Sequence, residues 1–127
     1  MGKEYVTLPD KFSPVGAYSQ VVRVGNLYFI SGQIPMDLDT KNIIKSDIRA
    51  QTHQVMKNIK EMLAHIHLSL SHIVKVTIFT INLEKFSDIN EVYAAYFNGN
   101  LPARSCIQVS RLPLDVDIEI EVVAAAD

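Results

Sequence analysis

The chain has 127 residues, and its 12 Lys and Arg against 14 Asp and Glu give a formal net charge of -2. This balance, with no stretch that concentrates basic side chains, argues against a nucleic-acid binder, and the single cysteine excludes an intrachain disulfide framework and multi-cysteine zinc sites. No apolar run approaches the roughly 20 residues of a membrane span and the first residues lack a signal-peptide core, so we expect a cytoplasmic protein without a membrane contact.

The first half of the chain predicts a β-hairpin followed by a helix. We expect residues 1–127 to form one domain, because two domains would each be too small to bury a core. Residues 17–35 predict the hairpin, since β-branched and aromatic residues flank the turn at Gly25-Asn26. After a polar loop, Ser46 or Asp47 is placed to cap the helix. The apolar residues of this helix recur every three or four positions: Ile48, Val55, Met56, Ile59, Met62, Leu63 and Ile66.

The second half predicts a strand, a second helix and two further strands. Residues 72–82 are rich in β-branched side chains and predict a strand. A helix is predicted over 88–98, where Asp88 and Glu91 have the spacing of a capping pair. We interpret its apolar stripe as core: Ile89, Val92, Tyr93, Tyr96 and Phe97. The closing strands cover 104–110 and 116–125. This order predicts an α+β fold with two helices on one face of a mixed sheet.

The strand over 72–82 is apolar on both faces, which bears on assembly. One face is expected to carry Val74, Val76, Ile78 and Thr80, and the other Ile73, Thr77, Phe79 and Ile81. Two helices can cover only one face of a sheet, so the second face is expected to meet another subunit. The alternative is that Lys75 marks a solvated face with scattered apolar residues.

The two closing strands carry the candidate chemistry. If they pair as a hairpin with Cys106 opposite Glu119, then Arg104 lies opposite Glu121 and within reach of Glu119. Asp117 then shares this face, and three neighbouring carboxylates raise one another's pKa, as a proton-transfer site requires. The same pattern fits a solvated charged face with a surface ion pair. Patterning alone leaves both interpretations open.

The remaining chemistry-bearing residues give weaker indications. No histidine lies in a metal-binding spacing with other ligands, so we expect no metal site. Cys106 has no evident histidine partner, and we interpret it as a packed thiol and not as a nucleophile.

Four short motifs in order resemble the RidA/YjgF family of enamine and imine deaminases. They are Val15-Gly16-Ala17-Tyr18-Ser19-Gln20, Ile30-Ser31-Gly32-Gln33-Ile34-Pro35, Pro102-Ala103-Arg104-Ser105-Cys106, and Arg111-Leu112-Pro113 with Ile118-Glu119-Ile120-Glu121. The resemblance covers essentially the whole chain. It implies a chorismate-mutase-like protomer and a homotrimer whose sheets form a central β-barrel, with active sites between subunits.

The resemblance also implies an activity. Family deaminases hydrolyse 2-imino acids, such as 2-iminobutanoate and 2-iminopropanoate, to 2-keto acids and ammonia, without a cofactor. These reactive intermediates leave pyridoxal-phosphate-dependent dehydratases, so the activity limits metabolite damage. The alternatives are a non-catalytic trimer that binds small carboxylates, or a translation-inhibiting regulatory protein with ribonuclease-like activity.

Carried over by position, the resemblance assigns two residues to catalysis. Arg104 is expected to bind the substrate carboxylate through its planar guanidinium, and Glu119 to activate water or move a proton to the departing nitrogen. The expected substrate-binding residues are Arg104, Cys106, Tyr18, Ser31, Gly32 and Asn90.

Overall fold

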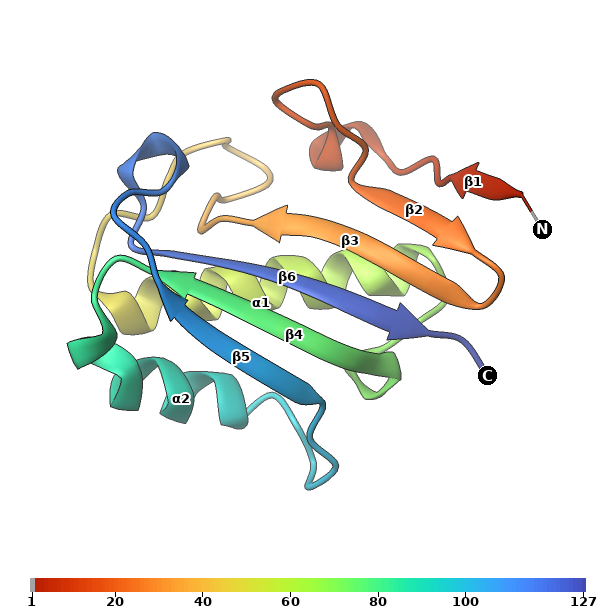
Figure 1. Ribbon diagram of the computed structural model, residues 1–127. Helices are drawn as coiled ribbons and strands as arrows, with labels where there is room; N and C mark the ends of the chain where they lie inside the picture. Colours follow the sequence, from red (N-terminus) through yellow and green to blue (C-terminus); the bar gives the residue numbers. More distant parts are fainter. Residues whose placement is uncertain (1) are drawn as a thin grey trace.

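The protein is built on one six-stranded sheet with two helices on one face (Figure 1). The computed structural model describes residues 2–127. The sheet has the order β1-β2-β3-β6-β4-β5, and only β4 and β5 are parallel neighbours. The strands are β1 (Lys3–Tyr5), β2 (Val21–Val24), β3 (Leu27–Gln33), β4 (Ile73–Thr80), β5 (Ala103–Gln108) and β6 (Ile118–Ala125). The predicted α+β fold with a mixed sheet is confirmed.

The predicted hairpin forms between β2 and β3. Val24 pairs with Leu27 across the turn, and Gly25 adopts a positive φ of 61° that a turn of this kind requires. The strand alternates in burial, with Tyr28 and Ile30 facing the helices and Phe29 facing the opposite side.

The first helix, α1 (Ile48–His65), starts where the sequence predicts. Asp47 is the N-cap, because its side chain accepts a hydrogen bond from the backbone N–H of Ala50 at 2.8 Å. Ile66, predicted inside the helix, is the C-cap residue. The predicted apolar stripe from Ile48 to Leu63 is buried against the sheet.

The second helix, α2 (Phe86–Ala94), begins and ends earlier than the predicted range of 88–98. Asp88 and Glu91 do not form the expected capping pair. Instead, both carboxylates bind the guanidinium of Arg49 on α1, at 3.2 and 3.1 Å. These ion pairs fasten the two helices side by side over the sheet.

The apolar core lies between the sheet and the helices. On β6, Ile118, Ile120, Val122 and Ala124 face the helices and are buried, as the alternation predicts. On β4, Val76, Ile78 and Thr80 do the same. An irregularity between Ile73 and Lys75 shifts the start of β4, so Ile73 is buried and Val74 exposed, the reverse of the prediction.

The two C-terminal strands do not pair with each other, so the hairpin predicted between residues 104–110 and 116–125 is wrong. β4 lies between them, parallel to β5 and antiparallel to β6. The connection from β4 to β5 runs through α2, which provides the crossover that parallel strands need. The sequence order of strand, helix and two strands over residues 72–125 is compatible both with a C-terminal hairpin and with a β5 that lies beside β4.

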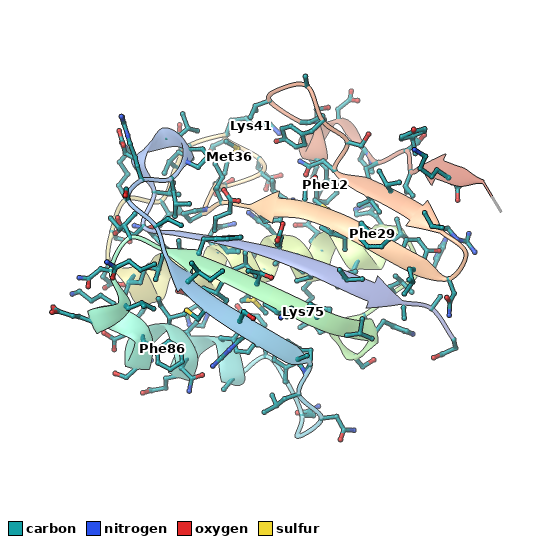
Figure 2. The ribbon with its side chains drawn as sticks, viewed as in Figure 1. Phe12, Phe29, Met36, Lys41, Lys75 and Phe86 are labelled. Carbon is teal, nitrogen blue, oxygen red and sulfur yellow. The ribbon has the colours of Figure 1, made fainter. Side chains whose placement is uncertain are left out.

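The sheet face away from the helices carries apolar side chains that no described element covers; we call it the open face. It includes Val22, Phe29, Phe79, Ile107 and Val123. Phe29 is 45% exposed and Ile107 is 44% exposed. Figure 2 labels Phe29 and Lys75, which lie on this side of the sheet. It also labels Phe86, the first residue of α2. Within residues 2–127, neither helix has the length and hydrophobicity to cross a bilayer.

The cap of α1 gives a stability prediction. Asp47→Ala leaves the Ala50 N–H without its side-chain acceptor and should lower the free energy of unfolding by about 1 kcal/mol. Urea denaturation followed by circular dichroism measures the change. Ser46→Ala is the matched control and should leave the midpoint unchanged; equal losses in both variants would contradict the assignment of the cap.

Candidate active site

Four of the predicted site residues gather at a cavity on the open face. The cavity has a volume of about 630 Å³ and is bounded by the ends of β3 and β6, the loop before β2, and the turn before β6. Its lining residues are Val15, Tyr18, Ser31, Gly32, Ile34, Pro113, Leu114 and Glu119. Glu119 is the only ionisable carboxyl group among them, in a wall that is otherwise apolar or hydroxylic.

A bulge in β3 shapes this cavity. Ile30 pairs with Val122 and Gln33 pairs with Ile120, so β3 has one residue more than β6 over this stretch. Both Ile30 and Gln33 face the helices and are buried. The two residues between them, Ser31 and Gly32, both line the cavity.

Gly32 leaves the space that Glu119 occupies. A Cβ atom built on Gly32 would lie 2.7 Å from the carboxyl carbon of Glu119 and 3.0 Å from its Cγ. Those distances are too short for a Cβ atom unless the Glu119 side chain moves, so the Glu119 carboxyl lies directly against the glycine backbone. Glycine provides space for this carboxyl and not a special backbone conformation, since its φ is not in the left-handed region.

The Glu119 carboxyl holds its proton more tightly than an ordinary glutamate. Burial raises its pKa above the usual value, and the negative charge of Glu121 raises it further. Glu121 lies two residues on, on the same face of β6. A raised pKa makes this carboxylate a stronger base than an ordinary glutamate, which suits it to proton transfer.

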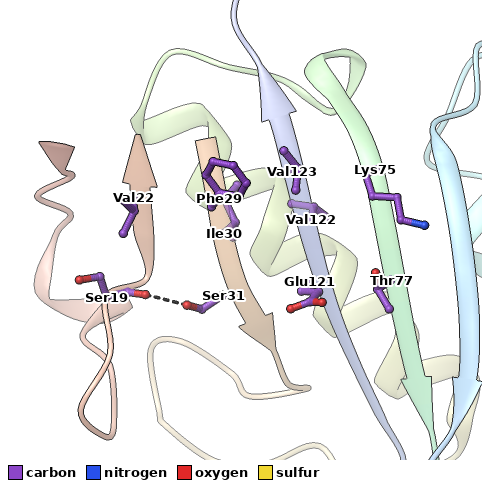
Figure 3. Close-up of a pocket in the computed structure, with 10 residues that line it drawn as sticks. All are labelled: Ser19, Val22, Phe29, Ile30, Ser31, Lys75, Thr77, Glu121, Val122 and Val123. Carbon is purple, nitrogen blue, oxygen red and sulfur yellow. Dashed lines mark hydrogen bonds between the residues drawn. The ribbon is translucent and has the colours of Figure 1, made fainter. Parts of the chain in front are cut away.

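A second cavity of about 310 Å³ adjoins the first along the open face (Figure 3). Ser31 lines both cavities, and its hydroxyl donates a hydrogen bond of 2.6 Å to the backbone oxygen of Ser19. Lys75 and Glu121 supply opposite charges to this cavity, beside the apolar Phe29. In Figure 3, Glu121 of β6 and Thr77 of β4 lie side by side on this face.

Arg104 lies on the other side of the sheet. It pairs with Val76 of β4, which pairs with Val122 of β6, and both valines are buried under the helices. Its guanidinium donates a hydrogen bond of 2.8 Å to the side-chain oxygen of Asn90 on α2. No Asp or Glu among residues 2–127 forms an ion pair with it.

Cys106 follows two residues later on the same face as Arg104. Burial raises the pKa of the Cys106 thiol, while the positive charge of Arg104 acts in the opposite direction. The net effect favours the neutral thiol, consistent with a packing role. Cys106, Arg104 and Asn90 thus form one cluster between β5 and α2.

Arg104 and Glu119 therefore do not share a face, and the predicted register is wrong. Cys106 pairs with Ile78 and not with a residue of β6, while Glu119 pairs with Phe79 on the open face. Because side chains alternate across a sheet, inserting β4 between the two strands puts Arg104 and Glu119 on opposite sides.

Asp117 also leaves the predicted carboxylate row. Its side chain accepts a hydrogen bond from Gln51 of α1 at 3.1 Å, and its backbone N–H donates to the Gln51 side-chain oxygen at 2.9 Å. Asp117 thus fastens the start of β6 to α1. Only Glu119 and Glu121 remain on the open face of the strand.

Two aromatic residues beside Arg104 were not predicted as part of the site. The guanidinium carbon lies 5.2 Å from the ring centre of Phe86 and 5.0 Å from that of Tyr93. Phe86 precedes the predicted helix, and Tyr93 was assigned to the core. Positions 86, 90 and 93 lie on one face of a helix, so their spacing could have indicated that Phe86 and Tyr93 accompany Asn90 at the site.

Comparisons with known proteins agree on one family. The sequence profile described as Endoribonuclease L-PSP matches residues 9–126. A RutC family protein of Pyrococcus abyssi is 46% identical over 124 residues, which cover 98% of each chain. A crystal structure from Yersinia pestis, YyfA of the conserved Rid protein family, has a TM-score of 0.92 at 40% identity, covering 98% of this chain and 100% of that one.

Escherichia coli TdcF, solved with bound serine, has a TM-score of 0.85 at 39% identity, covering 90% of this chain and 91% of that one. These matches extend over nearly the whole length of the protein. The chain belongs to the RidA/YjgF family.

Proposed function

We propose that the protein hydrolyses 2-imino acids and their enamine tautomers to 2-keto acids and ammonia, at sites formed by two protomers. The observation that carries this proposal is that each protomer holds two incomplete half-sites. One is a partly buried guanidinium, Arg104, that forms no ion pair within residues 2–127, and the other is a carboxyl group, Glu119, with a raised pKa in a cavity. A partly buried cation that lacks a carboxylate is suited to bind one from a ligand.

The two half-sites contact different parts of the substrate. Arg104 binds the substrate carboxylate as a planar fork, held by Asn90, and the Cys106 backbone N–H assists it. The Glu119 cavity of a neighbouring protomer, with Tyr18, Ser31 and Gly32, covers the imine carbon. Serine bound to the relative TdcF is a small acid of the same general kind, with a carboxylate beside a nitrogen-bearing carbon.

The chemistry requires little beyond orientation and proton transfer. The carbon of a protonated imine is already electrophilic, and Glu119 takes a proton from the attacking water as the C–O bond forms. The resulting carbinolamine has a hydroxyl and an amine on one carbon. Glu119 returns the proton to nitrogen and then accepts the hydroxyl proton as the carbonyl forms. The C–N bond breaks, ammonia leaves, and this last proton passes to the ammonia or to solvent, which restores the carboxylate. The residues provide this sequence without a cofactor.

The assembly that joins the half-sites is proposed to be a homotrimer with the open faces turned inward around a barrel. The exposed Phe29 and Ile107 supply the apolar surface for such contacts. β5 is the last strand of the sheet, so Arg104 lies beside an edge that a neighbouring protomer can approach.

An RNA-directed activity, suggested by the family description, fits the cavity less well. Glu119 and Glu121 lie on its side of the sheet and repel a phosphate backbone. Salt separates the two activities, because phosphate-driven binding weakens steeply as salt rises while turnover of a small imine changes little. A binding trimer without catalysis would retain ligand affinity and release no ammonia.

Loss of the guanidinium should abolish most turnover. Imines generated in situ from several amino acids, with semicarbazide as the competing trap, give 2-keto acid at a rate that measures the enzyme. Arg104→Ala should lower kcat/KM by about 100-fold, because the substrate is no longer oriented. Arg104→Lys keeps the charge but loses the fork and should recover only part of the activity. Near wild-type ammonia release from Arg104→Ala would refute the assignment.

Mixing two inactive variants tests whether the half-sites come from different protomers. Arg104→Ala and Glu119→Gln are each expected to fold and to lose turnover. After unfolding and joint refolding in equal amounts, some interfaces combine the intact Arg104 of one variant with the intact Glu119 of the other. Random mixing around a head-to-tail ring should restore about one quarter of wild-type activity. No recovery in mixed oligomers of confirmed composition would mean that the site is not shared.

The charge of Glu121 should shift the acid side of the pH profile, because it contributes to the raised pKa of Glu119. Glu119 must be ionised to take a proton from water, so kcat/KM falls as the pH drops through its raised pKa. Glu121→Gln removes one cause of the raised pKa and should shift this decline to lower pH. Glu4→Gln, on the distant strand β1, is the control of equal charge change. Superimposable profiles for Glu121→Gln and the wild-type enzyme would exclude the predicted coupling.

Adding one methyl group at Gly32 should displace Glu119. The backbone of Gly32 is compatible with alanine, so the variant should fold with little change in thermal midpoint. The Glu119 carboxyl must then move from its position, which should lower kcat by about 10- to 100-fold. Keto-acid formation and thermal unfolding measure the two effects separately. A fully active Gly32→Ala enzyme would show that this carboxyl position is not required.

A further inference from the structure

We propose that Tyr93 is a positioning residue whose ring fixes the plane of the Arg104 guanidinium, so that its free edge is presented to the substrate carboxylate. This inference rests on the proposed carboxylate-binding role of Arg104. It assigns to Tyr93 a function in ligand binding beyond its contribution to the core.

Three side chains contact the Arg104 guanidinium. The ring of Tyr93 lies 5.0 Å from the guanidinium carbon and the ring of Phe86 lies 5.2 Å from it. Asn90 accepts a hydrogen bond of 2.8 Å from one terminal nitrogen. Phe86, Asn90 and Tyr93 project from the same face of α2, so one helix supplies all three contacts.

Contacts with aromatic rings do not compete with a carboxylate for the guanidinium N–H groups. Aromatic rings interact with the face of a cation, while a carboxylate binds in the plane, along the edge of the N–H groups. A long arginine side chain without such contacts would lose rotational freedom when the ligand binds. Holding it beforehand reduces that entropic cost and favours binding.

The ring of Tyr93, and not its hydroxyl, accounts for this effect. Tyr93 is 3% exposed, and its hydroxyl is buried with no hydrogen-bond partner among residues 2–127. A buried hydroxyl without a partner is unfavourable for folding. Removing the oxygen while keeping the ring should therefore preserve the position of Arg104 and leave the fold at least as stable.

Ligand binding by Tyr93 variants tests the inference. Isothermal titration with L-serine and with 2-oxobutanoate gives affinities that do not depend on catalysis, and imine hydrolysis gives kcat and KM. Tyr93→Leu should raise Kd and KM by about tenfold, with kcat within about twofold of wild type. Tyr93→Phe should keep Kd and KM within about twofold, with an equal or higher thermal midpoint.

Tyr96→Leu is the matched control for a general loss of packing. Tyr96 is a partly buried aromatic residue two positions after the last residue of α2, and its ring centre lies 5.8 Å from that of His53. This variant should lower the thermal midpoint and leave Kd and KM unchanged. If Tyr93→Leu does not fold, Phe86→Leu removes the other ring and should raise Kd and KM in the same way.

Two results would overturn the inference. One is an equal loss of affinity in Tyr93→Phe and Tyr93→Leu, which would assign the effect to the hydroxyl. The other is an unchanged Kd in a folded Tyr93→Leu protein. Failure of the proposed reaction is distinguishable, because wild-type protein would then show no imine hydrolysis while the carboxylate titrations would still report on Arg104.

Discussion

The site depends on a constraint of β-sheets: side chains of paired residues point to the same face, and successive residues alternate. β4 lies between β5 and β6, and its pairing places Arg104 with the buried Val76 and places Glu119 with Phe79 on the open face. No change of rotamer brings a side chain through a sheet. The parallel pairing of β4 with β5 therefore separates the cation from the carboxyl group within each chain.

The open face and the separated half-sites lead to the same requirement. An apolar sheet face is stable in water only when another layer covers it, and a guanidinium without an anion is complete only when a carboxylate approaches it. The proposed assembly would satisfy both, since it covers the exposed Phe29 and Ile107 and joins the half-sites of neighbouring protomers. In this view folding energy and catalytic geometry come from one set of contacts.

Sequence patterns predicted local structure well and pairing between distant strands poorly. The Gly25-Asn26 turn, the Asp47 cap and the buried stripe of β6 each depend on neighbouring residues, and all three are present. The partner of the C-terminal strand depends on where a crossover helix delivers the chain, which alternation of side chains does not encode. The motifs assigned the candidate site residues by resemblance, but they could not say that these residues lie on two faces.

The extra residue in β3 reverses the alternation of inward-facing and outward-facing side chains along the strand. Before it, even-numbered positions such as Ile30 point inward; after it, the inward position is Gln33. Deleting one residue between them would give a more regular ladder, yet would swing the glycine away from the carboxyl it accommodates. A homologue with no deletion between residues 30 and 33 is therefore expected to keep this cavity, and this criterion is more informative than overall sequence identity.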